Sequence, residues 1–311
     1  SLYAMSHLDT EYVEPHHEQL QLAHEFLLTG LRKHGKVAAP DGTLDYPTYG
    51  AAMWLIAAQR LELELSADER QQLTQWIVDA QLTERHDVAE DNIQFGGWDL
   101  EASSGAKGDQ LKGTNISITS FALEALQGSM HKEVDDVVGR ARSWTERCQN
   151  EDGGFVFHVW RRHPGNKAMW TDESQTNAIS YATPTCDGLR CLVYCGAATD
   201  AAPCQQAITW LADHPDVEFV PCFESKAKEY GWREGLRYYY YFTQAKTLPY
   251  LPEAESKRRA GARGRPPRGQ GPRAQKHRNR RRRRQRGCPP SRRGGNRRPR
   301  RQPPPCGRGS R

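Results

Sequence analysis

The sequence contains no apolar run that approaches the ~18 residues with which a helix crosses a bilayer. Its longest strongly apolar stretch covers residues 51–58, so a transmembrane helix is not expected. The first residue is Ser1 rather than Met, which is consistent with a fragment and leaves open a lost signal peptide or further N-terminal repeats. These features do not define the compartment, and the cytoplasm is the default expectation.

Cysteine pairs with the close spacing of most structural zinc sites are also absent. The six cysteines of residues 1–256 include no Cys-x-x-Cys. Cys191 and Cys195 lie one helical turn apart near an expected core face, where small thiols pack as apolar groups. We therefore expect reduced, buried thiols, no metal site and no cofactor.

The last 55 residues, 257–311, contain no Asp or Glu and no Leu, Ile, Val, Met, Phe, Tyr or Trp. They hold 23 of the 44 Lys and Arg residues, so residues 1–256 carry a net charge of −17 although the whole chain is at +6. A segment without large apolar side chains cannot bury enough surface to offset its conformational entropy. We predict that this tail is disordered.

Two interpretations of the tail stay open. It is either an arginine-rich arm that binds nucleic acid or another acidic surface, or the product of a frameshift near codon 257 of a GC-rich gene. GC-rich codons read out of frame yield Arg, Gly, Pro and Ala. We favour the frameshift, because no aromatic residues interrupt the arginine run at 280–284. Nucleic acid is therefore an expected partner only if the tail is genuine.

What the sequence does contain is a repeated motif within residues 1–256. Trp76, Trp144 and Trp210 are 68 and 66 residues apart, and a fixed period indicates a repeat architecture. The middle copy is the fullest, the first is interrupted by an insertion, and the third is degenerate. The residues expected to hold the repeats together are Trp76, Gln81, Gly97, Trp98, Trp144, Gln149, Asp152, Gly153, Gly154 and Phe155.

The hydrophobic periodicity predicts helical hairpins. Residues 49–63 are apolar over much of the helix surface, as in an inner helix that packs on two sides. Residues 68–82 bury a single stripe and predict an outer helix, with Ser66 as N-cap and Glu69 completing a capping box. A fourth inner helix is expected to begin near Leu236. The other predicted pairs are 116–126 with 134–149, and 181–195 with 202–213.

The motif at residues 140–155 resembles the QW-type repeat of the prenyltransferase and squalene-oxidase repeat group, which includes squalene-hopene cyclases and the β subunits of protein prenyltransferases. The resemblance covers roughly residues 45–250 and is greatest to bacterial repeat proteins of this group that have no assigned chemistry. It implies an α/α toroid, a ring of hairpins whose inner helices surround a central cavity. We therefore expect an all-α, incomplete toroid of at least three hairpins over residues 1–256, followed by the tail.

Two catalytic signatures of that group are absent from the matching positions. Cyclases carry an Asp-x-Asp-Asp-Thr-Ala run, whereas residues 117–122 read Ser-Ile-Thr-Ser-Phe-Ala, and hydroxyls cannot protonate an alkene. Protein prenyltransferases bind zinc with an Asp-Gly-Cys run, but here Leu189 takes the cysteine position after Asp187. Cys186 would point about 100° away around the helix. The acidic residues 133–136 lie at the start of an outer helix, where the helix dipole favours carboxylates.

Asp187 is the best single candidate for catalysis, because a carboxyl at a cavity rim can act as a general acid or base. The alternative is a capping or salt-bridging role at the helix start. His158 and residues 161–163 form either an anion-binding loop or a solvated surface. Aromatic residues on and near the fourth inner helix are expected in part to face the cavity and in part to fill the core. The expected cavity residues are Tyr181, Trp232, Tyr238, Tyr239 and Tyr241.

Two functions are compatible with these features. The first is binding or processing of an isoprenoid or another apolar ligand in a central cavity. For an enzyme, the resemblance implies a terpenoid cyclase-like isomerase or a prenyltransferase-like transferase. The second is a non-catalytic repeat scaffold that binds a protein or peptide, which the loss of both signatures favours. A shared fold alone does not decide between them.

Overall fold

The computed structural model describes residues 2–38, 46–100, 113–160, 166–170, 178–223, 231–253 and 257. Within these ranges all regular secondary structure is helical, and β-type pairing is limited to isolated bridges such as that between Gln149 and Phe155. The prediction of an all-α fold is confirmed. Apart from Lys257, the tail at 257–311 lies outside the described residues, so the prediction of its disorder is not tested.

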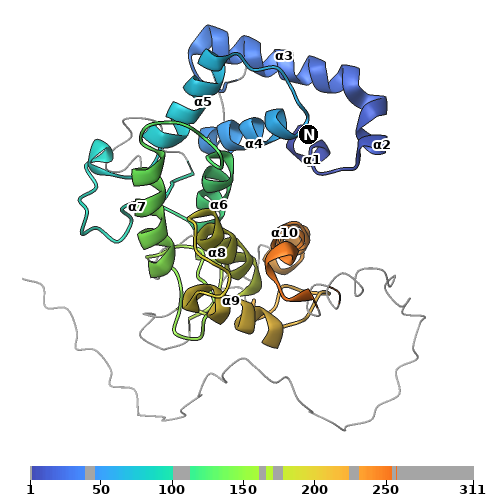
Figure 1. Cartoon of the computed structure of the whole chain (residues 1–311). Coiled ribbons are helices and arrows are strands. Elements are labelled where there is room, and N and C mark those ends of the chain that lie inside the picture. The colour runs from blue at the N-terminus through green and yellow to red at the C-terminus, as the bar shows by residue number, and fades with distance from the viewer. Residues whose placement is uncertain are drawn as a thin grey trace, which may run out of the picture.

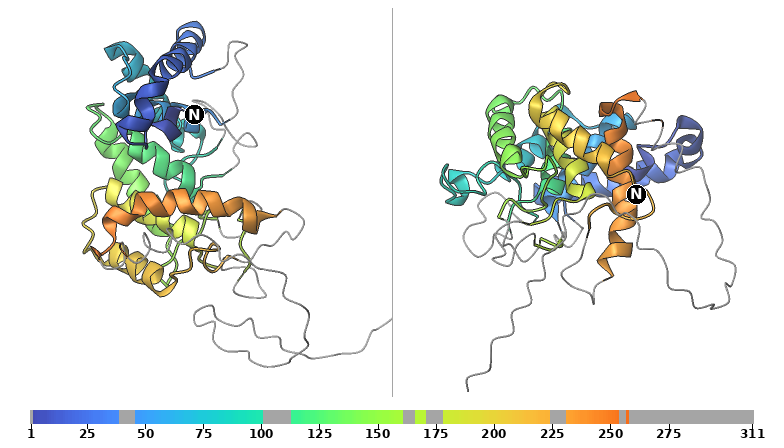
Figure 2. Two further views of the ribbon diagram at one scale, coloured as in Figure 1. Left: turned by 90° about the vertical axis from the view of Figure 1, so that its right-hand side faces the viewer. Right: turned by 90° about the horizontal axis from the view of Figure 1, so that it is seen from below.

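The inner layer consists of four helices, α4 (Pro47–Arg60), α6 (Ile116–Ala125), α8 (Ala182–Tyr194) and α10 (Trp232–Thr247). Helix α4 packs on α6, α6 on α8, and α8 on α10, so the layer follows the order of the chain (Figures 1 and 2). Residues 116–124 of α6 and 182–192 of α8 are all buried. This explains why the inner helices are apolar over most of their surface.

The outer layer consists of α5 (Ala67–Asp79), α7 (Val134–Arg147) and α9 (Ala202–Asp213). Helix α5 packs on α4 and α9 packs on α8, whereas α7 contacts both α6 and α8. These helices bury one stripe only, which in α7 includes Val137, Ala141 and Trp144. The capping box predicted at Ser66 and Glu69 is present at the start of α5. Short 3₁₀ turns follow α5 and α10, η2 (Glu84–His86) and η4 (Leu248–Tyr250).

A group of N-terminal helices precedes the first hairpin, and the repeat pattern does not predict it. The group comprises α1 (Leu2–Met5), α2 (Thr10–Val13), the 3₁₀ turn η1 (Glu14–His16) and α3 (His17–His34). Helix α1 packs against α3 and α4. In α3, His24 Nδ1 accepts a hydrogen bond from Trp54 Nε1 at 3.0 Å, and its Nε2 donates to the Glu64 carbonyl at 2.8 Å. These contacts fix the N-terminal helices on the first hairpin.

Each glutamine of the repeat joins its own Gly-Gly turn to the next outer helix. Gln81 Nε2 donates to the carbonyls of Gly96 and of Val137 in α7, both at 2.9 Å. Gln149 Nε2 donates in the same way to Gly153 at 3.0 Å and to a carbonyl of α9 at 2.9 Å. Two successive hairpin junctions are therefore held by the same pair of hydrogen bonds.

The second glycine of each turn lies against a tryptophan of the following hairpin. A Cβ on Gly97 would meet the Trp144 indole at 2.5 Å, and a Cβ on Gly154 would meet Trp210 Nε1 at 2.8 Å. The first glycine of the second turn, Gly153, has φ of +86°, a conformation that side chains disfavour. The close approach and the backbone conformation together require glycine in this turn.

The remaining repeat residues pack on the same turns. Trp98 and Phe155 follow the glycine pairs, are buried, and donate their backbone N–H groups to threonine hydroxyls of the next inner helix at 3.3 and 3.0 Å. Asp152 Oδ2 accepts a hydrogen bond from Trp210 Nε1 at 3.1 Å. Trp76 is half-buried on α5. The period of the sequence thus corresponds to a recurring set of contacts between hairpins.

Replacing Gln81 by Leu is expected to lower the free energy of unfolding by about 2–4 kcal/mol, because two buried carbonyls and the Arg140 guanidinium lose their partner. The matched control is Gln71→Leu on the exposed face of α5, with an expected effect below about 0.5 kcal/mol. Urea unfolding followed by circular dichroism measures both. Equal effects of the two substitutions would contradict the role of Gln81 at the hairpin junction.

Candidate functional site

An aromatic pocket lies between α1 and three of the inner helices. Its volume is about 690 Å³, which is within the range of roughly 300–1,000 Å³ for small-molecule sites. The described residues that line it are Tyr3 and Ala4 of α1 and His7 in the turn after it, Tyr46, Tyr49, Gly50 and Met53 at the start of α4, Phe121 of α6, and Tyr239 and Phe242 of α10.

The rings of the pocket wall pack against one another. Phe121 and Phe242 are stacked, with centroids 5.9 Å apart and planes at 3°. Tyr3 packs edge-on against both, at 5.4 and 5.8 Å, and Tyr49 packs edge-on against Phe121 at 5.3 Å. Ring contacts of this kind stabilise beyond the area they bury. The four helices α1, α4, α6 and α10 therefore hold the wall in place together.

Helical spacing decides which aromatic residues of α10 reach the pocket. Tyr239 and Phe242 are three residues apart, so they share one face of the helix, and both line the pocket. Tyr238 lies on another face and is 77% exposed. Tyr240 is buried, and its hydroxyl donates to the Asp216 carbonyl at 2.9 Å.

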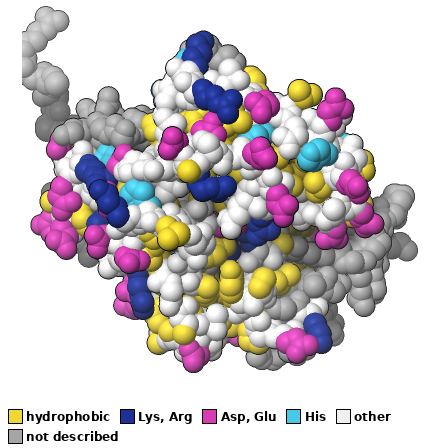
Figure 3. Space-filling model, turned by 45° about the horizontal axis from the view of Figure 1, so that its top comes forward, with side chains coloured by type: hydrophobic (Ala, Val, Ile, Leu, Met, Phe, Trp, Pro, Cys, Tyr) yellow, Lys and Arg dark blue, Asp and Glu magenta, His cyan; other side chains and the backbone are white. Residues whose placement is uncertain are grey.

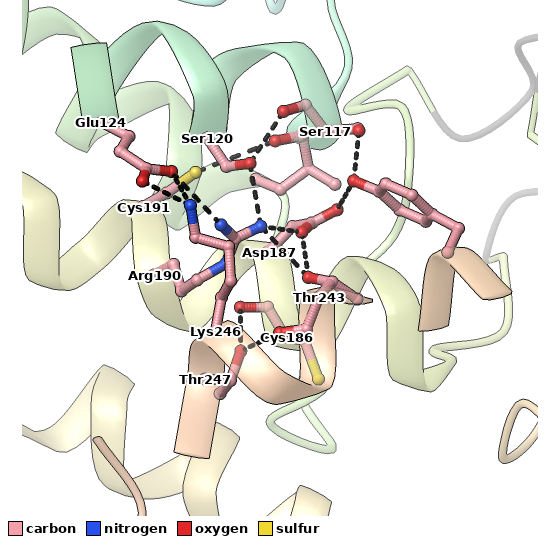
Figure 4. Close-up of polar contacts among 12 residues, drawn as sticks. Ser117, Ser120, Glu124, Cys186, Asp187, Arg190, Cys191, Thr243, Lys246 and Thr247 are labelled. Atoms are coloured by element: carbon pink, nitrogen blue, oxygen red, sulfur yellow. Dashed lines mark hydrogen bonds and ion pairs between the residues drawn. The ribbon is translucent and has the colours of Figure 1, made fainter. Parts of the chain in front are cut away.

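Two of the pocket tyrosines, Tyr49 and Tyr239, belong to a chain of hydrogen-bonded hydroxyl groups that ends at Asp187 of α8. Figure 4 shows Ser117 and Asp187 of this chain. The Tyr49 hydroxyl of α4 donates to Ser117 Oγ of α6 at 2.7 Å. Ser117 Oγ lies 2.5 Å from the Tyr239 hydroxyl of α10, which donates to Asp187 Oδ2 at 2.8 Å. The chain thus connects all four inner helices and links the pocket wall to a carboxylate.

Asp187 is 1% exposed and forms an ion pair with Arg190, which is fully buried. Arg190 Nη2 donates to Asp187 Oδ1 at 2.5 Å, and the Thr243 hydroxyl donates to the same oxygen. The same Nη2 lies 3.2 Å from Ser120 Oγ. Burial alone would lower the pKa of Arg190, but the charge of Asp187 and neighbouring groups raise this pKa well above its ordinary value. The guanidinium therefore stays charged.

A second ion pair lies beside the first (Figure 4). Lys246 of α10 binds both carboxylate oxygens of Glu124 of α6 and donates to the Tyr3 hydroxyl at 2.8 Å. Glu124 Oε2 also lies 3.8 Å from Arg190 Nη1. Burial lowers the pKa of Lys246 to about 8, and the Glu124 carboxylate opposes this shift. With Asp187, the cluster contains two acids and two bases, so its charges balance.

From the sequence, Asp187 is expected at a cavity rim, whereas in the structure it lies behind the pocket wall. Between its carboxylate and the pocket stands the ring of Tyr239, and its two oxygens are engaged by Tyr239, Arg190 and Thr243. This geometry corresponds to the salt-bridging interpretation of Asp187 and not to a carboxyl that touches a ligand.

Of the five aromatic residues expected to line a cavity, Tyr239 is the one among the described pocket residues. Tyr181 is buried just before α8 and packs into the core. Trp232 is half-buried at the first position of α10. Tyr241 contacts the ring of the exposed Tyr238 at 6.3 Å. Tyr238 and Tyr241 lie on other faces of α10 than Tyr239, whereas Trp232 lies two turns before Tyr239 on the same face, and Tyr181 precedes a helix that supplies none of the described pocket residues.

Other expected features lie away from the pocket. Glu133 precedes α7 and forms a surface pair with Arg85 at 2.5 Å. His158 is buried, with Nδ1 2.8 Å from the Thr114 carbonyl, and residues 161–163 lie outside the described part. Five of the six cysteines of residues 1–256 are buried, as expected, whereas Cys222 is half-buried.

The sequence does not identify three of the charged residues in the buried ion pairs beside the pocket, Glu124, Arg190 and Lys246. A signal for them exists, because each is a charged side chain on an otherwise apolar or aromatic inner helix and must find a buried partner. Their pairing is not visible in the sequence, since the partners come from different hairpins. Tyr3 and His7 are likewise missed, because α1 and the turn that follows it lie outside the repeat.

Comparisons with protein-family models, with curated proteins and with solved structures find no match for this chain. In the ranges that the structure describes, no helix is both long and apolar enough to span a bilayer. The same ranges hold no cluster of three or more His, Cys, Asp or Glu side chains that could bind a metal ion. Function is therefore inferred from the pocket and its wall.

Replacing Arg190 by Met is expected to lower the free energy of unfolding by about 3–5 kcal/mol, because the buried Asp187 carboxylate loses its cationic partner. Arg142→Met is the matched control, since it breaks the exposed pair with Glu146 and is expected to cost less than about 1 kcal/mol. Denaturant titration of both variants gives the comparison. A loss for Arg190→Met as small as the control would show that the buried pair does not anchor the inner layer.

Stability is also expected to fall as the pH drops from 6.5 towards 4. Burial, followed by the charge of Lys246, lowers the pKa of His7 from 6.5 to about 4. The unfolded chain therefore binds a proton before the folded chain does, and stability that is fully present above pH 6.5 is lost through this window. Because His7 is only half-buried, the loss is about 1 kcal/mol.

Urea unfolding at about pH 7.5 and about pH 5 checks this dependence. His7→Gln is expected to remove this part of the acid sensitivity, while His17→Gln at an exposed position leaves it as in the wild type. An unchanged pH dependence in His7→Gln would contradict the assignment.

Proposed function

We propose that the protein binds an apolar small molecule of isoprenoid size in the aromatic pocket. The observation that carries this proposal is the pocket itself, about 690 Å³ in volume and lined mainly by aromatic and aliphatic side chains from four helices. Contact with such a lining favours ligands that leave water with a large apolar surface. The packed rings of Phe121, Phe242 and Tyr3 support a site that is already formed before a ligand arrives.

We further propose that the helices form an incomplete α/α toroid of the prenyltransferase and squalene cyclase-like group. The ordered inner layer and the recurring Gln and Gly-Gly contacts support this architecture. Helix α1 contributes to it, because Tyr3 contacts both Phe121 of α6 and Phe242 of α10 and packs near α4. The pocket would then be the central cavity, with α1 on its open side.

The pocket wall is better suited to holding a ligand than to a specific reaction. Asp187 and Glu124 are both engaged in ion pairs, so neither carboxylate is available as a strong acid at the pocket surface. The polar groups nearest the lining are the hydroxyls of Tyr3, Tyr49 and Tyr239. We therefore propose ligand binding as the function and assign no catalytic step to either carboxylate.

A peptide-binding scaffold is the second candidate, and a different surface favours it. A groove of about 1400 Å³ lies between α3, α5 and the loop after α6, with Glu25, Arg32, Glu69 and Lys132 among its residues. The residues that line the groove include acidic, basic and apolar side chains, and side chains of these three kinds are interspersed on the face of the molecule shown in Figure 3. Such a mixed lining suits a polar peptide better than an isoprenoid.

Native mass spectrometry of the full chain after incubation with farnesol tests the first candidate. One bound molecule is expected. Met53→Trp places an indole in the pocket and is expected to weaken binding about tenfold or more. Leu22→Trp is the matched control, because Leu22 is 66% exposed on α3 and lies outside both the pocket and the groove residues.

Ala4→Phe is a second pocket variant at an exposed position of α1 that is less costly to folding. The expected result is weaker binding in both pocket variants and wild-type binding in Leu22→Trp. No binding of farnesol to the wild type, or undiminished binding in both pocket variants, would overturn the proposal and leave the groove as the candidate surface.

A further inference from the structure

The hydrogen bonds that join Tyr49 to Asp187 through Ser117 and Tyr239 all run in one direction. The carboxylate of Asp187 at the end of this chain determines that direction. Asp187 forms an ion pair with Arg190, and an ionised carboxylate only accepts hydrogen bonds. The proton of the Tyr239 hydroxyl therefore points to Asp187 Oδ2, at 2.8 Å. Because a phenol has a single proton, Tyr239 must accept at its other contact, and Ser117 donates to it at 2.5 Å.

Counting hydroxyl protons in the same way gives the direction of the first hydrogen bond of the chain, between Tyr49 and Ser117. Ser117 has used its proton on Tyr239, so it accepts from the Tyr49 hydroxyl at 2.7 Å. Burial raises the pKa values of Tyr49 and Tyr239 well above their ordinary range, and the Asp187 charge adds to this, so both phenols keep their protons at neutral pH. All three hydroxyl protons thus point away from the pocket, towards Asp187.

This arrangement leaves Tyr49 as a hydrogen-bond acceptor at the pocket. Tyr49 lines the pocket, it donates its one hydroxyl proton to Ser117, and this bond leaves the lone pairs of the Tyr49 oxygen available to accept. A chain of hydroxyls that ends on a carboxylate is polarised along its length, which strengthens the acceptor at its far end. A ligand group placed against this oxygen gains a hydrogen bond only if it is a donor.

The charges around the pocket favour an uncharged donor. Lys246 Nζ lies 5.3 Å from the centroid of Tyr3 and 5.7 Å from that of Phe242, so these pocket rings already face a cation. A second cation beside it would be repelled. Neither of the two buried cations is available to an anionic group, because Lys246 is paired with Glu124 and Arg190 with Asp187.

We propose that the pocket selects apolar alcohols, and that Tyr49 recognises the ligand hydroxyl by accepting its hydrogen bond. This inference rests on the proposed function, since it names the class of ligand for the same pocket. The apolar chain or ring system occupies the aromatic lining, and the hydroxyl lies at the Tyr49 end of the hydroxyl chain.

Fluorescence titration with farnesol and with its methyl ether tests the proposal, because the two ligands share one chain and differ in the donor. The wild type is expected to bind the alcohol roughly five- to tenfold more tightly than the ether. In Tyr49→Phe the alcohol should fall to the affinity of the ether, with the ether unchanged. Farnesyl phosphate is expected to bind no more tightly than the ether.

Ser117→Ala gives an independent readout. It removes the acceptor for the Tyr49 proton, which becomes free to donate to an ether oxygen, so the preference for the alcohol should disappear mainly through a gain for the ether. Tyr12→Phe is the matched control, because it removes a phenol hydroxyl from an exposed residue of α2 outside the pocket, and the preference should persist.

The outcomes separate the two proposals. Equal binding of alcohol and ether by the wild type would overturn the selection for alcohols and leave apolar binding intact. A preference that survives in both Tyr49→Phe and Ser117→Ala would overturn the role of Tyr49. Tighter binding of farnesyl phosphate would overturn the exclusion of anions. If none of the three ligands binds, the proposed function fails together with this inference.

Discussion

The ion pair of Asp187 and Arg190 lies where α6, α8 and α10 meet, and the chain of hydroxyls that reaches the pocket depends on it. Arg190 reaches α6 through Ser120 and α10 through Thr243, while Asp187 reaches α10 through Tyr239. Two buried charges are stable only with good geometry and further hydrogen bonds, so these contacts restrict how the three helices can pack. The orientation of Tyr239, and through it of the hydroxyl chain, follows from that restriction.

The hairpin junctions impose a second constraint, which sets the spacing of the helices around this centre. A glutamine side chain crosses from one hairpin to the next outer helix, and a tryptophan of the next hairpin covers a glycine that has no room for a side chain. Because these contacts recur with the period of the sequence, successive inner helices are placed in equivalent positions. The aromatic residues of α4, α6 and α10 then converge on one pocket, and α1 supplies its remaining wall.

The parts of the structure that could be predicted are those encoded by local patterns. The distinction between inner and outer helices follows from the hydrophobic periodicity of each segment. The capping box at Ser66 and the buried thiols likewise follow from residues within one segment. The site could not be predicted in the same way. Which of Tyr238, Tyr239 and Tyr241 faces a pocket depends on the rotation of α10, which its partners α8 and α1 determine. The buried charges of Glu124 and Lys246 required a partner, but their pairing depends on contacts between distant segments.

The most direct measurement is a crystal structure of the protein grown in the presence of farnesol. Density for the isoprenoid chain is predicted in the aromatic pocket between Met53 and Phe242, with the hydroxyl within hydrogen-bond distance of the Tyr49 oxygen. An empty pocket, or farnesol bound only in the groove beside α3 and α5, would contradict the assignment of the pocket as the functional site.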